Sequence, residues 1–210
     1  MMTVLSKLTQ GFAALAVVAT LGLASSAQAA VTVGEKAPDF TLTNAAGESI
    51  SLSSFAGKNV VLEWFNKDCP FVRKHYDSAN MQTLQKEYVA KDVVWLVINS
   101  SAPGRQGHET AAEALTTLEK EAAAPTHYLF DTDGTVGKLY DAKTTPHMFV
   151  IDKEGTLVYA GAIDDRASAD KADIAGAKNY VRAALDAILA GQAVETASSK
   201  PYGCGVKYAN

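Results

Sequence analysis

The sequence predicts one α/β domain that has a mixed central sheet with helices on both faces. Runs 60–65 and 93–98 are almost entirely apolar and rich in valine, a pattern typical of strands that are covered on both sides. A segment with helical periodicity separates these runs, which indicates a βαβ unit with parallel strands. Two later apolar runs flank the short turn 153–155, which predicts an antiparallel hairpin. Parallel and antiparallel strands together make the sheet mixed.

The composition fits a single domain. The chain has 210 residues, 48% of them hydrophobic, and a formal net charge of -4. This apolar content is sufficient for one well-buried domain rather than two, and we place it at residues 30–192. Charges of both signs are interspersed, without the clustered basic patch that binds nucleic acid. We therefore expect no nucleic-acid partner.

The first 29 residues have the layout of a secretory signal peptide. Lys7 supplies a basic start, residues 11–23 are apolar, and residues 27–29 form a small-x-small cleavage site. The apolar stretch is shorter than the ~20 residues that span a bilayer. We expect cleavage after Ala29, export to the periplasm, and no stable membrane insertion afterwards.

The first half of the domain is expected to fold as strand, helix, strand. Run 60–65 precedes Pro70, and proline is favoured at the first position of a helix. A helix from Pro70 to about Val89 would bury apolar residues that recur at helical spacing, namely Val72, Tyr76, Met81, Leu84 and Tyr88. Run 93–98 follows as the second strand.

The second half begins with a polar loop at 100–107. In chain order, the expected elements after it are a helix at about 109–121, a strand at 127–130 closed by the turn 131–134, hairpin strands at 148–152 and 156–159, and a helix at about 172–189. The segment 193–210 is a polar tail of small residues that carries Cys204.

Cys69 lies where a buried strand passes into a helix that begins at Pro70. At a helix N-terminus, unpaired N–H groups and the positive end of the helix dipole stabilise an anion. A thiolate held there has a lowered pKa, and the thiolate is the nucleophilic form of cysteine. We therefore predict Cys69 as the catalytic nucleophile. The alternative is an inert cysteine of the core.

Charged neighbours modify this expectation. Lys67, Arg73 and Lys74 are close in sequence and add positive field around Cys69, whereas Asp68 opposes it.

Glu63 is the second unusual residue, because it lies inside an apolar strand six residues before Cys69. Desolvation raises the pKa of such a carboxyl group. An acid of raised pKa beside a thiol can relay the protons that disulfide exchange requires. The alternative is a glutamate at the strand end that faces solvent or pairs with a lysine, and the sequence favours neither interpretation.

Pro146 directly precedes the first hairpin strand. Proline at this position is compatible with a simple strand start. The functional interpretation is a cis Thr145–Pro146 peptide whose backbone shapes a substrate groove against the reacting thiol.

These features resemble the thioredoxin-like superfamily, and most closely its redoxin branch, which includes the alkyl hydroperoxide reductase/thiol-specific antioxidant proteins. The stretches that carry the resemblance are VGEKAPDF at 33–40, WFNKDCP at 64–70, Thr145-Pro146 and GAIDD at 161–165. Glu63 falls where thioredoxins carry a buried acid. The resemblance implies a thioredoxin-like fold and thiol-dependent redox chemistry, with neither a cofactor nor a bound metal.

The motif CPFV at 69–72 and the tail motif GCGVK at 203–207 narrow the resemblance to a peroxiredoxin-like subgroup. Two departures matter. Thioredoxins use C-x-x-C, but Val72 stands at the fourth position. Typical peroxiredoxins use P-x-x-x-T-x-x-C, but Leu62 and Asn66 stand at the first two of those positions, which leaves the peroxide-activating set incomplete.

Cys204 is the candidate for the missing second thiol. It stands between two glycines in a tail that we expect to be mobile. After Cys69 attacks a disulfide, or a peroxide to give a sulfenic acid, a second thiol can resolve the intermediate. The alternatives are a permanent Cys69–Cys204 bridge and a Cys204 without a role.

The leading hypothesis is an exported thiol–disulfide oxidoreductase or peroxiredoxin-like enzyme that acts on protein or small-molecule disulfides or peroxides and is recycled by an external thiol reductant. Its site residues are Cys69, Cys204, Glu63 and Pro146. The first rival is a thiol peroxidase. The second is a non-catalytic binding module or copper chaperone, because thiolate and imidazole suit copper and because His75 and His147 lie close to Cys69 and Pro146 in sequence.

Overall fold

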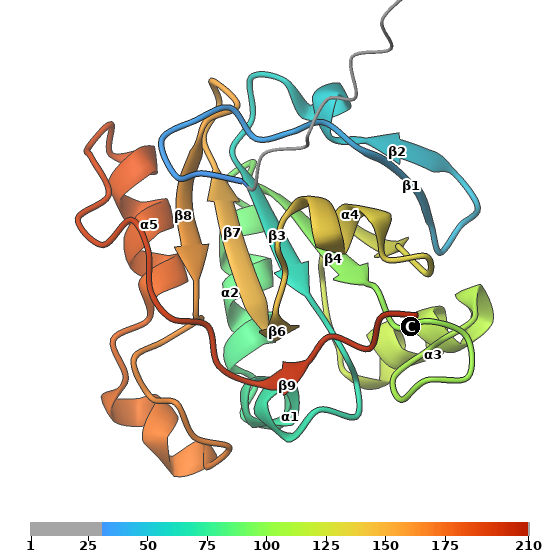
Figure 1. Cartoon of the computed structure of the whole chain (residues 1–210). Helices are drawn as coiled ribbons and strands as arrows, with labels where there is room; N and C mark the ends of the chain where they lie inside the picture. The colour runs from blue at the N-terminus through green and yellow to red at the C-terminus, as the bar shows by residue number, and fades with distance from the viewer. Residues whose placement is uncertain (1–30, 210) are drawn as a thin grey trace, which may run out of the picture.

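A computed structural model describes residues 31–209, and the predicted signal peptide lies outside them. Within this range, seven strands form one mixed sheet in the order β2-β1-β5-β4-β3-β7-β8 (Figure 1). Their bounds are β1 (Thr41–Asn44), β2 (Ser49–Ser51), β3 (Val60–Trp64), β4 (Val94–Asn99), β5 (His127–Phe130), β7 (His147–Ile151) and β8 (Leu157–Gly161). Strands β3, β4 and β5 are parallel, and the other neighbours are antiparallel.

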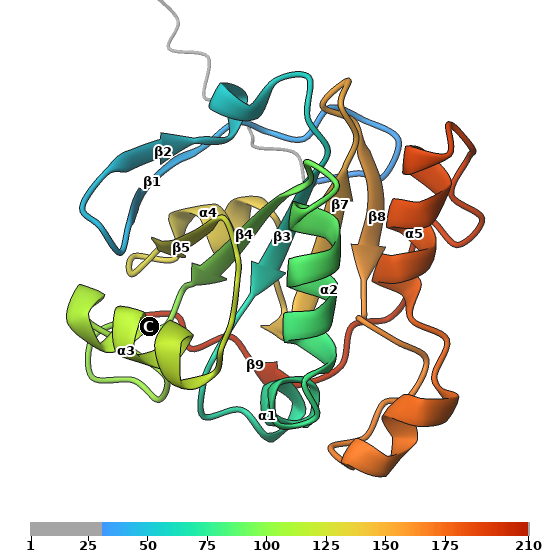
Figure 2. The same cartoon turned by 180° about the vertical axis from the view of Figure 1, so that it is seen from behind.

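Helices cover both faces of the sheet, as the sequence predicted. The helices are α1 (Pro70–Asp77), α2 (Asn80–Val89), α3 (Ala111–Lys120), α4 (Thr135–Leu139) and α5 (Tyr180–Leu189). Helices α2 and α5 lie on the face shown in Figure 2, and α4 lies on the opposite face. No helix within residues 31–209 is long and apolar enough to cross a bilayer.

Two apolar cores result from the alternation of side chains along the central strands. On β3, Val61 belongs to the core under α2 and α5, whereas Val60 and Leu62 belong to the core under α4. Strand β4 alternates in the same way. Because both faces are packed, these strands are apolar at almost every position, which is why the two runs could be recognised in the sequence.

The helix expected from Pro70 to about Val89 is divided into α1 and α2. Ala79 adopts a left-handed conformation with φ 58°, which an L-residue cannot continue into a helix. The Ser78 hydroxyl donates to Lys74 O at 2.7 Å, a local bond that competes with regular helix geometry. The predicted buried face is confirmed, since Val72, Tyr76, Met81, Leu84 and Tyr88 are all buried.

The helix expected at about 172–189 is also too long. Residues Lys171–Gly176 form a 3₁₀ helix, Ala177 is extended, and α5 begins only after Asn179. The Asn179 side chain accepts from the Arg182 N–H at 2.9 Å, so it caps the helix. Val181, Ala184 and Leu185 are buried as predicted, whereas Ile174 is only half-buried.

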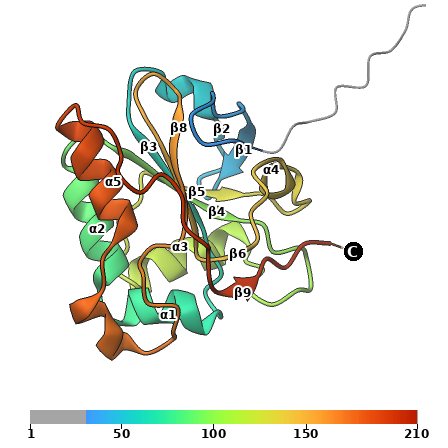
Figure 3. The same ribbon diagram turned by 60° about the vertical axis from the view of Figure 1, so that its left-hand side comes forward.

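The C-terminal tail, which we expected to be mobile, packs along the body of the protein in this structure (Figure 3). Strand β9 (Cys204–Gly205) pairs with β6 (Thr144–Thr145) in a small antiparallel ladder, with Cys204 opposite Thr145. Further on, the Lys207 carbonyl accepts from the Ala102 N–H at 2.9 Å. The tail therefore crosses the sheet end at which β3 passes into α1.

Candidate active site

Cys69 is the N-cap residue of α1, one position before Pro70. Its backbone is extended, and its N–H donates to Asn66 O at 3.1 Å. The loop after β3 therefore turns the chain so that the thiol lies at the beginning of the helix. This is the placement predicted from the strand–Cys–Pro pattern.

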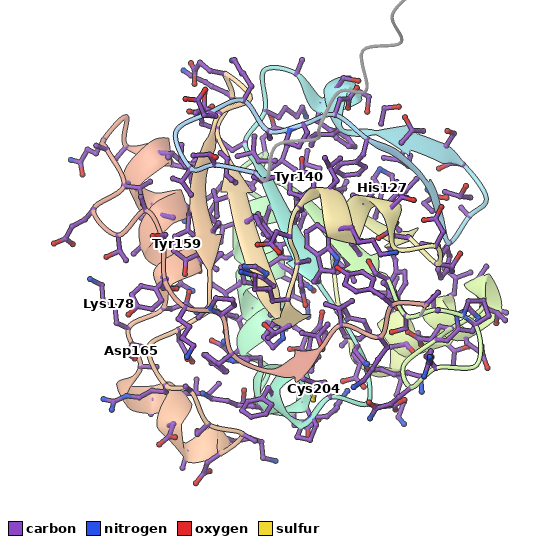
Figure 4. All side chains as sticks on the ribbon, in the orientation of Figure 1. His127, Tyr140, Tyr159, Asp165, Lys178 and Cys204 are labelled. Carbon is purple, nitrogen blue, oxygen red and sulfur yellow. The ribbon has the colours of Figure 1, made fainter. Side chains whose placement is uncertain are left out.

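The two cysteines lie together. Cys69 Sγ is 2.7 Å from Cys204 Sγ, and both thiols are free. Cys69 Sγ lies 3.0 Å from Thr145 O, to which it can donate only while it is protonated, and the Cys204 N–H points to Cys69 Sγ at 3.4 Å. Cys69 has 0% exposed surface, whereas Cys204 is half-buried. The tail, on which Cys204 is labelled in Figure 4, thus brings the second thiol to Cys69.

The surroundings shift the pKa values of the two thiols in opposite directions. Burial raises the pKa of Cys69, but the hydrogen bond from the Cys204 thiol and the N–H groups of Val72 and Cys204 outweigh it, so the pKa of Cys69 is lowered. Burial and the bond with Cys69 raise the pKa of Cys204 to about 11. Cys69 is therefore the more acidic thiol of the pair, and Cys204 remains protonated at neutral pH.

Hydrogen bonds, rather than the expected basic residues, lower the pKa of Cys69. Each of the three cations near it has an acidic partner. Lys67 pairs with Asp68, Arg73 pairs with Glu121 and Asp77, and Lys74 pairs with Asp164. The predicted positive field is thus largely neutralised.

The Thr145–Pro146 peptide is cis, as the sequence predicted. Thr145 contacts both cysteines. Its carbonyl oxygen lies against Cys69 Sγ, and its backbone pairs with Cys204. Gly203 permits this close approach. Its φ is 145° and a Cβ atom there would lie 2.1 Å from Thr145 O, so only glycine fits.

Glu63 is fully buried and faces α1 and α2. Its carboxylate accepts from Trp95 Nε1 at 2.7 Å, from the Tyr76 hydroxyl at 2.7 Å and from Gln85 Nε2 at 3.1 Å. Burial raises its pKa to about 7, against the lowering effect of these donors. A solvent-facing glutamate is therefore excluded. Within residues 31–209 the carboxylate bonds to these three side chains and to neither cysteine.

Both histidines that raised the copper hypothesis are occupied elsewhere. His75 contacts the Tyr202 hydroxyl at 3.2 Å and the Asn80 amide at 2.9 Å, and His147 stacks on Phe149. Burial lowers the pKa of each imidazole to about 4. The described part of the chain contains no cluster of three or more His, Cys, Asp or Glu side chains able to hold a metal ion.

Asn66, which stands where peroxiredoxins carry a hydroxyl donor, does not donate to Cys69. Its amide donates to Gln106 O at 3.2 Å and its oxygen accepts from the Asp68 N–H at 2.9 Å. The side chain therefore supports the loop before Cys69.

Two site residues were missed from the sequence. Thr145 was noted only as the partner of Pro146, and its hydroxyl is buried without a hydrogen-bond partner. Tyr202, two residues before Cys204, packs on Phe71 of α1, the helix that begins after Cys69. An aromatic residue beside GCG in an otherwise small and polar tail was the available signal.

Comparisons with known proteins identify the family and several relatives of this chain. The AhpC/TSA family model matches residues 33–160. The thioredoxin-like protein YneN of Bacillus subtilis is 26% identical over 71% of this chain and 84% of its own. The thiol-disulfide oxidoreductase ResA of Bacillus thuringiensis is 27% identical over 60% of this chain and 67% of its own. A solved structure of a hypothetical protein from Sinorhizobium meliloti has a TM-score of 0.71 at 28% identity and covers 86% of this chain and 97% of its own.

Proposed function

This chain belongs to the AhpC/TSA family of the thioredoxin-like superfamily, and from that membership and its paired cysteines we propose that it is an exported thiol–disulfide oxidoreductase in which Cys69 attacks and Cys204 resolves. Relatives named as thiol-disulfide oxidoreductases support thiol-dependent redox chemistry. The observation that carries the proposal is the 2.7 Å separation of two thiols at the N-terminus of α1, of which Cys69 has a lowered pKa and Cys204 a raised one.

The first step is attack of the Cys69 thiolate on one sulfur of a substrate disulfide. A bond forms between Cys69 Sγ and that sulfur, the substrate S–S bond breaks, and the other substrate sulfur leaves as a thiolate. The lowered pKa of Cys69 increases the fraction of the nucleophilic thiolate. Cys204 has to move aside for this step, because it covers Cys69.

The second step is attack of Cys204 on Cys69 Sγ. The Cys69–Cys204 disulfide forms, the mixed disulfide breaks, and the second substrate thiolate leaves. Two electrons have passed to the substrate. Its two sulfurs take up two protons, one from the Cys204 thiol and one from the solvent, which received a proton when Cys69 ionised. An external dithiol then reduces the Cys69–Cys204 disulfide by two further exchange steps and is itself oxidised to a disulfide.

Glu63 and Pro146 have supporting roles in this proposal. A carboxyl group with a pKa of about 7 changes protonation in the range where thiol exchange occurs, which suits a proton relay. Because Glu63 has no direct bond to either sulfur, such a relay would pass through an intervening group. Pro146 has no backbone N–H, and it follows Thr145, whose backbone pairs with an extended segment in β9.

Thiol trapping tests the assignment. The reduced protein is mixed with oxidised glutathione, quenched with N-ethylmaleimide and analysed by mass spectrometry. The unmodified chain is expected to give a Cys69–Cys204 bridge, Cys204→Ser to accumulate glutathione on Cys69, and Cys69→Ser to remain unreacted. Equal modification of Cys69→Ser and the unmodified chain would contradict the proposal.

Hydrogen peroxide in a parallel stopped-flow arm distinguishes the peroxidase rival. The arrangement of Asn66 offers no hydrogen-bond donor at Cys69, so we expect the reduced enzyme to react with peroxide no faster than a free thiol. A much faster reaction would reassign the chain as a thiol peroxidase that forms a Cys69 sulfenic acid.

A further inference from the structure

A buried polar cluster beside the thiols has no part in the steps above. Lys74 and His75 project from α1, Asp164 follows β8, and Tyr202 comes from the tail. Lys74 Nζ lies 3.4 Å from Asp164 Oδ2, and these two side chains are 0% and 2% exposed. Buried ion pairs are strongly disfavoured unless they are fully hydrogen-bonded, so each partner in this cluster matters.

Tyr202 completes the cluster. Its hydroxyl donates to Asp164 Oδ1 at 2.5 Å, and Lys74 Nζ lies 3.4 Å from the same hydroxyl. The Lys74 ammonium also lies 5.4 Å from the ring centroid. Burial and Asp164 raise the pKa of Tyr202, so the phenol remains a donor at neutral pH. A hydrogen bond to a charged carboxylate is among the stronger contacts available to a tyrosine.

The ring of Tyr202 attaches the tail to the same helix that carries Cys69. It packs edge-to-face on Phe71, with ring centroids 5.9 Å apart. Phe71 is two residues after Cys69, and Tyr202 is two residues before Cys204. Gly203, which stands between Tyr202 and Cys204, lies against Thr145 O. The tail is thus fixed to α1 immediately before the thiol that it delivers.

We propose that Tyr202 is a positioning residue: by docking into the Lys74–Asp164 pair it holds Cys204 against Cys69 and so sets the effective concentration of the second thiol. This inference rests on the proposed function, because it assumes that the two cysteines form a reversible disulfide. Release of the docked tyrosine would leave Cys204 on a longer flexible segment, and the effective concentration of a tethered group falls as its tether becomes longer and looser.

The test is the equilibrium of the full chain with glutathione, in which two protein thiols and one oxidised glutathione give one protein disulfide and two reduced glutathiones. The ratio of species yields the effective concentration of Cys204 at Cys69. Tyr202→Phe, which keeps the ring but removes the hydroxyl, is expected to lower it about tenfold. Tyr202→Leu is expected to lower it further.

Tyr208→Phe is the matched control. Tyr208 follows Cys204 in the sequence, whereas Tyr202 precedes it, and the Tyr208 hydroxyl donates to Ala142 O at 2.8 Å. Because Tyr208 contacts neither α1 nor the buried ion pair, its variant is expected to change the effective concentration by less than threefold. Urea unfolding of each reduced variant separates a loss of tail docking from a loss of the fold, and both Tyr202 variants are expected to remain folded.

A second readout follows from the hydrogen bonds at Cys69. If Cys204 leaves, its thiol and its N–H no longer donate to Cys69, whereas the Val72 N–H remains, and the burial that raises the pKa of Cys69 is reduced. The midpoint of the iodoacetamide rate profile should therefore shift in Tyr202→Phe and stay unchanged in Tyr208→Phe. An unchanged effective concentration in folded Tyr202→Phe and Tyr202→Leu would overturn the inference and leave the proposed function intact. Absence of any Cys69–Cys204 disulfide in the unmodified chain would refute the proposed function itself.

Discussion

Replacement of Glu63 by glutamine should remove a large pH dependence of stability. The side chain is fully buried, and burial raises its pKa from a usual 4.5 to about 7. Between these two values the folded protein binds a proton that the unfolded chain does not bind. Its contribution to stability is therefore fully present below about pH 4.5 and is lost as the pH rises through about 7.

The gap between the two pKa values corresponds to about 3 kcal/mol of unfolding free energy. Glutamine can take the place of the protonated acid. Its carbonyl oxygen can accept from Trp95 and Gln85 while its amide donates to the Tyr76 hydroxyl, in the positions that these partners already occupy. The variant should therefore fold. Residue 63 should no longer lower its unfolding free energy as the pH rises from about 4.5 to about 7.

Urea unfolding at pH 5, 6, 7 and 8 measures the effect. His75 and His147 oppose it, because burial lowers the pKa of each in the folded state to about 4. Their contribution is lost as the pH falls below the usual histidine value. The quantity to compare is thus the difference between the unmodified protein and Glu63→Gln, which should change by up to about 3 kcal/mol from pH 5 to pH 8. Glu154→Gln, at an exposed turn, is the control. A difference that does not vary with pH would show that Glu63 is ionised throughout and would refute this reasoning.

Two other predictions concern the ends of the chain. Gly203→Ala places a Cβ atom against Thr145 O, so the tail should undock, and the rate of Cys204 alkylation in the reduced protein should rise about tenfold or more; an unchanged rate would mean that the tail is held elsewhere. Export should remove residues 1–29, so the intact mass of the periplasmic protein should correspond to a chain that begins at Ala30, and a full-length chain in the cytoplasm would contradict export.

The sheet could be predicted from the sequence where side-chain burial alone determines the pattern. Strands β3 and β4 are covered on both faces, so their apolar runs identified them, and Pro70 marked the start of α1. The breaks at Ala79 and Asn179 could not be found in this way, because apolar spacing continues across both of them. Backbone conformation and capping ended those helices, and neither depends on hydrophobicity.

The local placement of Cys69 and the cis peptide could be predicted from the sequence, whereas the approach of Cys204 to Cys69 could only be offered as one of several alternatives. Cys69 and the cis peptide at Pro146 follow from local signals, namely a strand followed by Cys-Pro and a proline at a strand start. The proximity of Cys204 depends on a contact between residues far apart in the chain, and periodicity carries no information about such contacts. The ion pairs of Arg73 and Lys74 could not be predicted for the same reason, since their partners Glu121 and Asp164 are remote in sequence.

The tail adds to the burial of Cys69, which also packs in the apolar core with Phe65 and Val72. Cys204 covers the sulfur, donates to it, and pairs through its backbone with Thr145, whose carbonyl the same sulfur contacts. The contacts that stabilise the thiolate are therefore the contacts that shield it. A substrate disulfide cannot reach Cys69 until Cys204 withdraws, and once Cys204 withdraws the Cys69 thiolate loses the two hydrogen bonds that Cys204 donates. Attack on substrate and stabilisation of the resting thiolate thus compete, and the strength with which the tail docks determines the balance between them.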